Sequence, residues 1–166
     1  LLIMKRVLLV LGVLMSFLVT AQTNIQSTNT TAEEILFGDY DPADYAATTV
    51  IMDHEAIIQG IDDQINPDSL KLYLEIMSTF ENRNTGADTL SPTTGIGAAR
   101  TWAYNKFLEY SAANEDRLEV SYLKWDQTIC SVTSHKNIFA VLPGTDVDNH
   151  SVIVVEAHFD SRCEGS

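Results

Sequence analysis

The stretch SVIVVEAHFDSRCEGS, residues 151–166, decides the predicted fold. Its four apolar residues from Val152 to Val155 are bounded by polar residues, a pattern typical of a strand buried on both faces of a parallel sheet. Ligands of open α/β sheets bind beyond the carboxyl ends of such strands. The sequence therefore predicts an α/β fold with a functional site directly after this strand, at His158 and Asp160.

The spacing of His158 and Asp160 suits a metal site. A neutral imidazole binds zinc through one ring nitrogen, and its other nitrogen then donates to an acceptor that fixes the tautomer. Asp160 can supply that acceptor, or it can itself be a ligand. From this pattern alone, a strand-end histidine that hydrogen-bonds a loop stays open as an alternative.

A family resemblance covers the chain from Pro67 to Ser166. Its strongest parts are Ala157 to Ser161 (AHFDS) and Asn137 to Ala140 (NIFA) with Gly144, and weaker support comes from Phe80 to Arg83 and from Gly97-Ala98 with Trp102. Through these residues the chain resembles the M28 family of zinc-dependent exopeptidases, the aminopeptidase type. The resemblance implies an α/β fold in which helices cover a partial mixed sheet, the front part of a zinc-exopeptidase (phosphorylase/hydrolase-like) domain.

The resemblance also implies the roles of two residues. His158 would be a metal ligand of a two-zinc site, and Asp160 would be the catalytic-site aspartate that orients it. The implied reaction is hydrolysis of the N-terminal bond of a peptide or protein substrate. The family's other ligands and its general-base glutamate lie further along than Ser166, and a catalytic zinc needs about three protein ligands. We therefore expect a truncated, N-terminal part of the peptidase domain that is inactive by itself.

Two other functions stay open at this point. One is a glutaminyl-cyclase-like acyltransferase of the same fold, in which the histidine need not contact the single zinc. The other is a non-catalytic, exported binding module of the same fold. Activity on peptides with N-terminal glutamine distinguishes the first, and absence of bound metal distinguishes the second.

The start of the chain predicts export. Lys5 and Arg6 precede an apolar run from Val7 to Val19, and Ala21 provides a small residue at the exit, as in a secretory signal peptide. The run is shorter than the ~20 apolar residues of a membrane span. We expect residues 1–21 to be cleaved, leaving a secreted or periplasmic protein without a membrane anchor. Residues 22–64 would be a flexible linker or an N-terminal extension, and residues 65–166 the partial peptidase domain.

Charge and cysteine content restrict the partners and the compartment. The formal charge of −13 becomes −15 when Lys5 and Arg6 leave with the signal peptide. Such acidity argues against nucleic acid and anionic membranes, which basic patches bind. In an exported chain, Cys130 and Cys163 can form a disulfide, either with each other or with a cysteine beyond Ser166.

The remaining pattern predicts a short series of elements. Asn66-Pro67 begins a helix whose apolar stripe, expected in the core, includes Leu70 and Leu74. A second helix is predicted from Gly95 to Tyr110. Strands are predicted at residues 118–125, 137–142 and 152–155, which together imply a mixed sheet with helices on its face. Residues 22–31 are expected to be flexible and His54 to be a surface histidine.

Overall fold

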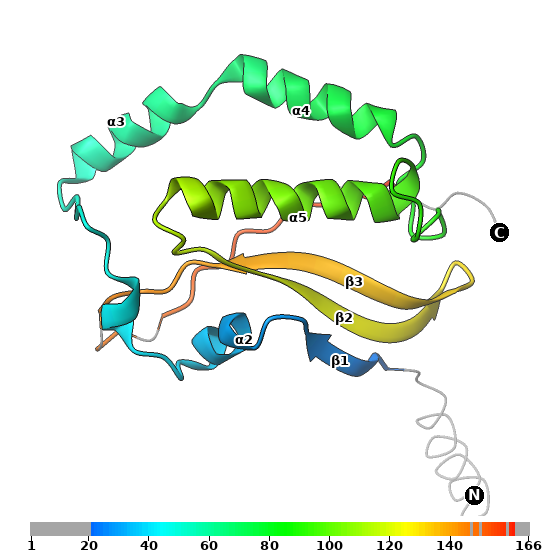
Figure 1. The fold of residues 1–166 in the computed structure, drawn as a ribbon, viewed down its shortest axis with the longest axis horizontal. Helices are drawn as coiled ribbons and strands as arrows, with labels where there is room; N and C mark the ends of the chain where they lie inside the picture. The colour runs from blue at the N-terminus through cyan, green and yellow to red at the C-terminus, as the bar shows by residue number, and fades with distance from the viewer. Residues whose placement is uncertain (1–20, 147, 150, 159, 162–166) are drawn as a thin grey trace, which may run out of the picture.

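The structure of the protein is a computed structural model that describes residues 21–146, 148–149, 151–158 and 160–161 (Figure 1). In this part of the chain a small sheet is combined with helices on both of its sides, so the architecture is α/β. The elements in chain order are β1 (Thr23–Ser27), α2 (Thr30–Phe37), the 3₁₀ helix η1 (Pro42–Tyr45), α3 (His54–Gln64), α4 (Pro67–Thr79), α5 (Gly95–Ala113), β2 (Glu119–Ile129) and β3 (Val132–Val141).

The sheet of the described residues has three antiparallel strands in the order β1-β2-β3. β2 and β3 form a long hairpin, with Glu119 opposite Val141 at one end and Ile129 opposite Val132 at the other. The turn between them uses Cys130 and Ser131, with φ angles of 50° and 67°. Two successive positive φ angles match the right-handed twist of the flanking strands.

The segment before α2 is held to the sheet by one buried hydroxyl. Ser121 of β2 is fully buried, and its Oγ accepts hydrogen bonds from the backbone N–H groups of Thr28 and Asn29, both at 3.1 Å. Asn29 then caps α2, because its Oδ1 accepts from the N–H of Thr31 at 3.0 Å. The prediction that residues 22–31 are flexible is therefore wrong, since pairing with β2 and the Ser121 contacts order this polar stretch.

Helix α5 packs on the hairpin from the side opposite to α2 (Figure 1). Its first turn lies close to the preceding loop. A Cβ on Gly97 would come 2.4 Å from the carbonyl oxygen of Thr89, and Gly95 has a φ of 75°. Glycine is needed at both positions, for close approach and for backbone conformation respectively.

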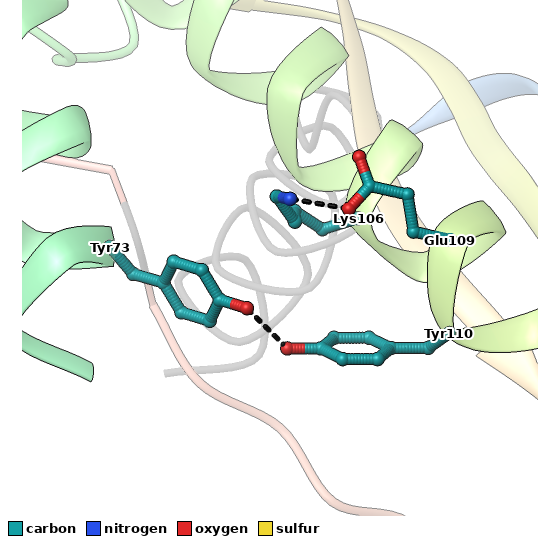
Figure 2. Close-up of polar contacts among 4 residues, drawn as sticks. All are labelled: Tyr73, Lys106, Glu109 and Tyr110. Atoms are coloured by element: carbon teal, nitrogen blue, oxygen red, sulfur yellow. Dashed lines mark hydrogen bonds and ion pairs between the residues drawn. The ribbon is translucent and has the colours of Figure 1, made fainter. Parts of the chain in front are cut away.

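Helix α4 contacts α5 through a narrow aromatic stripe (Figure 2). The ring centroids of Tyr73 and Trp102 are 5.6 Å apart, and the hydroxyls of Tyr73 and Tyr110 are 2.8 Å apart. Lys106, which pairs with Glu109, lies 5.8 Å from the centre of the Tyr73 ring. These contacts hold α4 beside α5. The hydrophobic core of the two helices is a cluster of Phe80, Ala98 and Ala99, against which Ile76 and Trp102 pack.

Several predicted elements are confirmed, and their bounds differ. The helices predicted from Pro67 and Gly95 are α4 and α5. The first two predicted strands correspond to β2 and β3, which are longer than expected and meet at Cys130-Ser131. Helices α2 and α3 were not anticipated. Among the described residues, no helix has both the length and the apolar character to cross a membrane.

Two predictions about apolar residues are wrong. Val152 to Val155 are not part of a strand, and their exposed fractions range from 65% to 92%. A strand buried on both faces needs hydrogen-bonded neighbours and covering helices, and the described residues place none around this segment. Leu70 and Leu74 are also exposed instead of buried in the core, because the side of α4 that packs against α5 and the core is the one with Tyr73 and Ile76. The expectation of a mixed sheet in a zinc-exopeptidase domain stays a prediction.

Candidate metal-binding site

The structure brings His158 and Asp160 into contact. Nδ1 of His158 lies 3.1 Å from Oδ1 of Asp160. A carboxylate oxygen only accepts, so this contact selects the tautomer in which Nδ1 carries the proton. The lone pair of the neutral imidazole is then on Nε2, which is the arrangement of a metal-binding histidine whose second nitrogen is held by a carboxylate.

The residue after Asp160 is attached to the loop that follows α4. The N–H of Ser161 donates to the carbonyl of Arg83 at 3.1 Å, and its Oγ donates to Oδ1 of Asn82 at 3.2 Å. Ser161 also forms an isolated parallel bridge with Asn84. These contacts fix the backbone next to Asp160, and therefore the position from which its carboxylate reaches the imidazole.

The two side chains differ in exposure. The side chain of His158 is 96% exposed and that of Asp160 is 40% exposed. Within the described residues, this imidazole contacts Asp160 through Nδ1. The Nε2 edge is therefore accessible to a ligand from outside the described part of the chain.

The donor set of the described residues fits one zinc ligand and no more. An imidazole nitrogen with a carboxylate behind it has the chemistry that zinc selects. However, no group of three or more His, Cys, Asp or Glu side chains that could hold a metal occurs in the described part of the chain. Since a catalytic zinc takes about three protein ligands, His158 needs further ligands from elsewhere.

The other described histidines have different surroundings. His54 is a surface residue as predicted, with its side chain 82% exposed and Nδ1 3.6 Å from Glu55. His135 is buried, its Nε2 lies 2.8 Å from the carbonyl oxygen of Gln127, and its ring stacks on Trp125. Because His135 contacts a backbone carbonyl and an indole ring of the same hairpin, it is a packing residue of the hairpin.

Sequence patterns did not reveal the residues that support the site. Asn82 and Asn84 lie in a polar loop about eighty positions before Ser161, and no short-range signal connects them. Arg83, in the same loop, donates from Nη1 to the carbonyl of Met77 at 2.6 Å. The predicted signal peptide, apart from Ala21, and Phe159 and Cys163 lie outside the described residues, so the pairing of Cys163 with Cys130 stays a prediction.

Comparison with known proteins identifies relatives of one kind. A protein named "Probable zinc metalloprotease" from Phaeosphaeria nodorum is 32% identical to this chain over 111 residues, which cover 63% of the chain and 22% of the relative. A protein of the same name from Pyricularia oryzae is 32% identical over 112 residues, covering 65% of the chain and 22% of the relative. A third, from Pyrenophora teres f. teres, is 31% identical over 111 residues, covering 63% and 24%.

The chain is thus similar to part of proteins named as probable zinc metalloproteases, and it spans about a quarter or less of their length. No family model matches the chain, and no solved structure matches it. The relatives' names agree with zinc and proteolysis among the expectations from sequence. They do not specify the M28 family, the aminopeptidase type or the number of zinc ions.

Proposed function

We propose that this chain is part of a secreted zinc-dependent exopeptidase of the M28 aminopeptidase type, in which His158 binds zinc and Asp160 orients it. The observation that carries the proposal is the 3.1 Å contact between Nδ1 of His158 and Oδ1 of Asp160. It is supported by the resemblance of the AHFDS segment and by the relatives named as probable zinc metalloproteases.

The two residues would divide the work of a metal ligand and its support. Nε2 of His158 would bind the ion, and Asp160 would hold the proton on Nδ1 and fix the ring's orientation. Ser161, bound to Asn82 and Arg83, would keep Asp160 at the correct distance. When bound, zinc supplies a Lewis acid that polarises the peptide carbonyl and lowers the pKa of its water.

The remaining ligands belong, in this proposal, to the longer protein. The described residues contain no group of three potential ligands, and the chain matches 22% of the length of its relatives. We therefore assign the general base, the other ligands and the second zinc ion to sequence outside this chain. Export is part of the proposal, and the Lys5-Arg6 and apolar pattern of the first 21 residues supports it.

The first test measures zinc in the protein expressed at its full natural length. We expect His158→Ala to lose most of one equivalent of zinc, measured by elemental analysis after dialysis. His54→Ala is a matched control, because His54 is also exposed and also lies beside an acid, Glu55, at 3.6 Å. Unchanged zinc content in His158→Ala, or equal loss in both variants, contradicts the assignment of His158.

The second test separates the candidate reactions. An aminopeptidase hydrolyses aminoacyl chromogenic amides and requires a free amino terminus, so an acetylated substrate should be inert. Cyclisation of peptides with N-terminal glutamine, without aminoacyl amide hydrolysis, would instead support the glutaminyl-cyclase-like acyltransferase. A protein that retains no zinc and has neither activity would support the binding module.

A further inference from the structure

The side chain of Asn82 joins the loop after α4 to the segment of the candidate metal site. Its Oδ1 accepts a hydrogen bond from Oγ of Ser161 at 3.2 Å, across 79 positions of sequence. The same Oδ1 accepts a second hydrogen bond, from the backbone N–H of Asn84 at 3.0 Å. One oxygen therefore closes a turn in its own loop and attaches that turn to the residue after Asp160.

The loop that carries Asn82 is fixed to the body of the protein. Phe80, just before it, belongs to the hydrophobic cluster between α4 and α5, and its carbonyl accepts from the N–H of Gly95, just after the loop, at 2.8 Å. Nη1 of Arg83 donates to the carbonyl of Met77 in the last turns of α4 at 2.6 Å. Because the loop is attached at its base and on one side, it provides Ser161 with a stable point of contact.

The backbone that leads into Asn82 has an unusual conformation. Glu81 has a φ of 59°, in the left-handed region that a glutamate rarely adopts. Its N–H donates to the carbonyl of Ser78 at 3.2 Å, which ends α4 immediately before Asn82. Such conformations persist where the surrounding structure holds them, and they cluster at functional sites. The turn at Glu81 sets the direction from which the Asn82 side chain reaches Ser161.

Ser161 has two attachments to this loop, and they depend differently on sequence. Its backbone N–H donates to the carbonyl of Arg83 at 3.1 Å, a bond that any residue other than proline can form. The bond from its Oγ needs a hydroxyl at position 161 and an acceptor at position 82. Asn82 itself is exposed, so its side chain is not needed to fill the core.

A chain of contacts therefore runs from Asn82 through Ser161 to its neighbour Asp160, and from there to Nδ1 of His158 at 3.1 Å. The groups of a functional site work only when they are held within about 0.5 Å of their positions by supporting contacts. We propose that Asn82 is a positioning residue of the metal site, which holds Ser161 and thereby the carboxylate of Asp160 behind the imidazole. This inference rests on the proposed function, in which His158 binds zinc and Asn82 does not touch the ion.

The first test measures zinc affinity in the protein at its full natural length, by competition with a chromogenic chelator. Asn82→Ala removes one exposed, neutral hydrogen bond and should weaken zinc binding by about threefold. Asn82→Asp keeps an acceptor oxygen at the same place and should bind zinc at least as tightly as wild type. Rescue by this variant distinguishes the acceptor from the bulk of the side chain.

Asn149→Ala is the matched control. Asn149 is also exposed, and its Oδ1 accepts from the backbone N–H of Ser151, two residues further along, at 3.0 Å. This contact resembles the one between Asn82 and Asn84, but Asn149 has no hydrogen bond to Ser161. The control variant should therefore bind zinc as wild type does. Circular dichroism checks that every variant keeps its helix content.

A double-mutant cycle tests whether Asn82 acts through Ser161. Ser161→Ala removes the hydroxyl and leaves the backbone N–H that donates to Arg83. The double variant Asn82→Ala/Ser161→Ala should bind zinc no more weakly than Ser161→Ala alone, because both substitutions remove the same hydrogen bond and contacting residues are not additive. A structural effect of Asn82 elsewhere would instead add to that of Ser161→Ala.

The tautomer of His158 gives a readout that does not need zinc. In metal-free protein with isotope-labelled histidine, nuclear magnetic resonance distinguishes a proton on Nδ1 from one on Nε2, and the His158 signals are those absent from His158→Ala. The contact with Asp160 favours the proton on Nδ1. Asn82→Ala should raise the share of the Nε2-protonated form, and Asn82→Asp and Asn149→Ala should not.

The outcomes separate this inference from the proposed function. Wild-type zinc affinity and tautomer in Asn82→Ala overturn the inference, as do an equal loss in Asn149→Ala and full additivity in the double-mutant cycle. Failure of the proposed function has another signature, because His158→Ala would keep its zinc. In that case a tautomer that still responds to Asn82→Ala supports the positioning of the imidazole without its role as a zinc ligand.

Discussion

Replacing Asp160 with asparagine tests the part of the site that the structure describes most directly. The substitution keeps the size of the side chain and an oxygen that accepts from Nδ1 of His158, and it removes the negative charge. The contact of 3.1 Å therefore becomes a neutral hydrogen bond, which is about half as strong as a charge-assisted one. The imidazole becomes a weaker and less oriented ligand.

The size of the effect follows from the exposure of the pair. Mutation of a residue that supports a metal ligand costs about 10- to 100-fold in metal affinity. The side chains of His158 and Asp160 are 96% and 40% exposed, so water screens their interaction and the lower end of this range applies. We expect Asp160→Asn to bind zinc about tenfold more weakly, which corresponds to about 1.4 kcal/mol.

The assay is competition for zinc between the full-length protein and a chromogenic chelator. Glu156→Gln is the matched control, because Glu156 also lies two residues from His158, on the other side, and is exposed. The control should have wild-type affinity. An unchanged affinity in Asp160→Asn, or an equal loss in Glu156→Gln, would refute the role of Asp160 in holding the imidazole.

Two predictions concern the fold. Ser121→Ala should lower the free energy of unfolding by about 1–2 kcal/mol in urea titrations, because a buried hydroxyl with several hydrogen bonds is lost, whereas the exposed Ser78→Ala should change it little. The hydrogen bond between the hydroxyls of Tyr73 and Tyr110 favours the neutral form of Tyr110 and raises its pKa to about 12, so this pair stabilises the fold fully below pH ~10 and loses its contribution as pH rises toward 12. Tyr73→Phe should bring the pKa of Tyr110, followed by tyrosinate absorbance, back toward about 10.

A capping residue at the start of a helix is a local sequence signal, and it was sufficient to predict α4. Asn66 caps α4 and is followed by proline, and the structure shows its Oδ1 accepting from the N–H of Asp68 at 2.9 Å. The same kind of signal precedes α3, where Oδ1 of Asp53 accepts from the N–H of Ala56 at 2.8 Å. Helix α3 could therefore have been predicted from Asp53 and the spacing of Ile57, Ile61 and Ile65.

The hairpin shows where local signals fail. Cys130 and Ser131 both adopt positive φ, although asparagine or aspartate followed by glycine is the usual sequence of such a turn. Nothing in these two residues predicts the turn, so the end of β2 and the start of β3 were placed incorrectly. Strand β1 was missed for a related reason. Its polar sequence becomes a strand only by pairing with β2, about a hundred residues later.

The segment from Val152 to Ser161 contains one feature that depends on local contacts and one that depends on distant neighbours. The His158–Asp160 contact depends on a two-residue separation and on one attachment, Ser161 to the loop at Asn82, and both are present in the described chain. Burial of Val152 to Val155 depends on neighbours on two faces and two edges, and the described residues provide none. The pair can therefore form while the apolar run before it stays 65% to 92% exposed. If the proposed longer enzyme covers this run, its side chains should become protected together with the gain of the remaining zinc ligands, because the same added sequence would supply both.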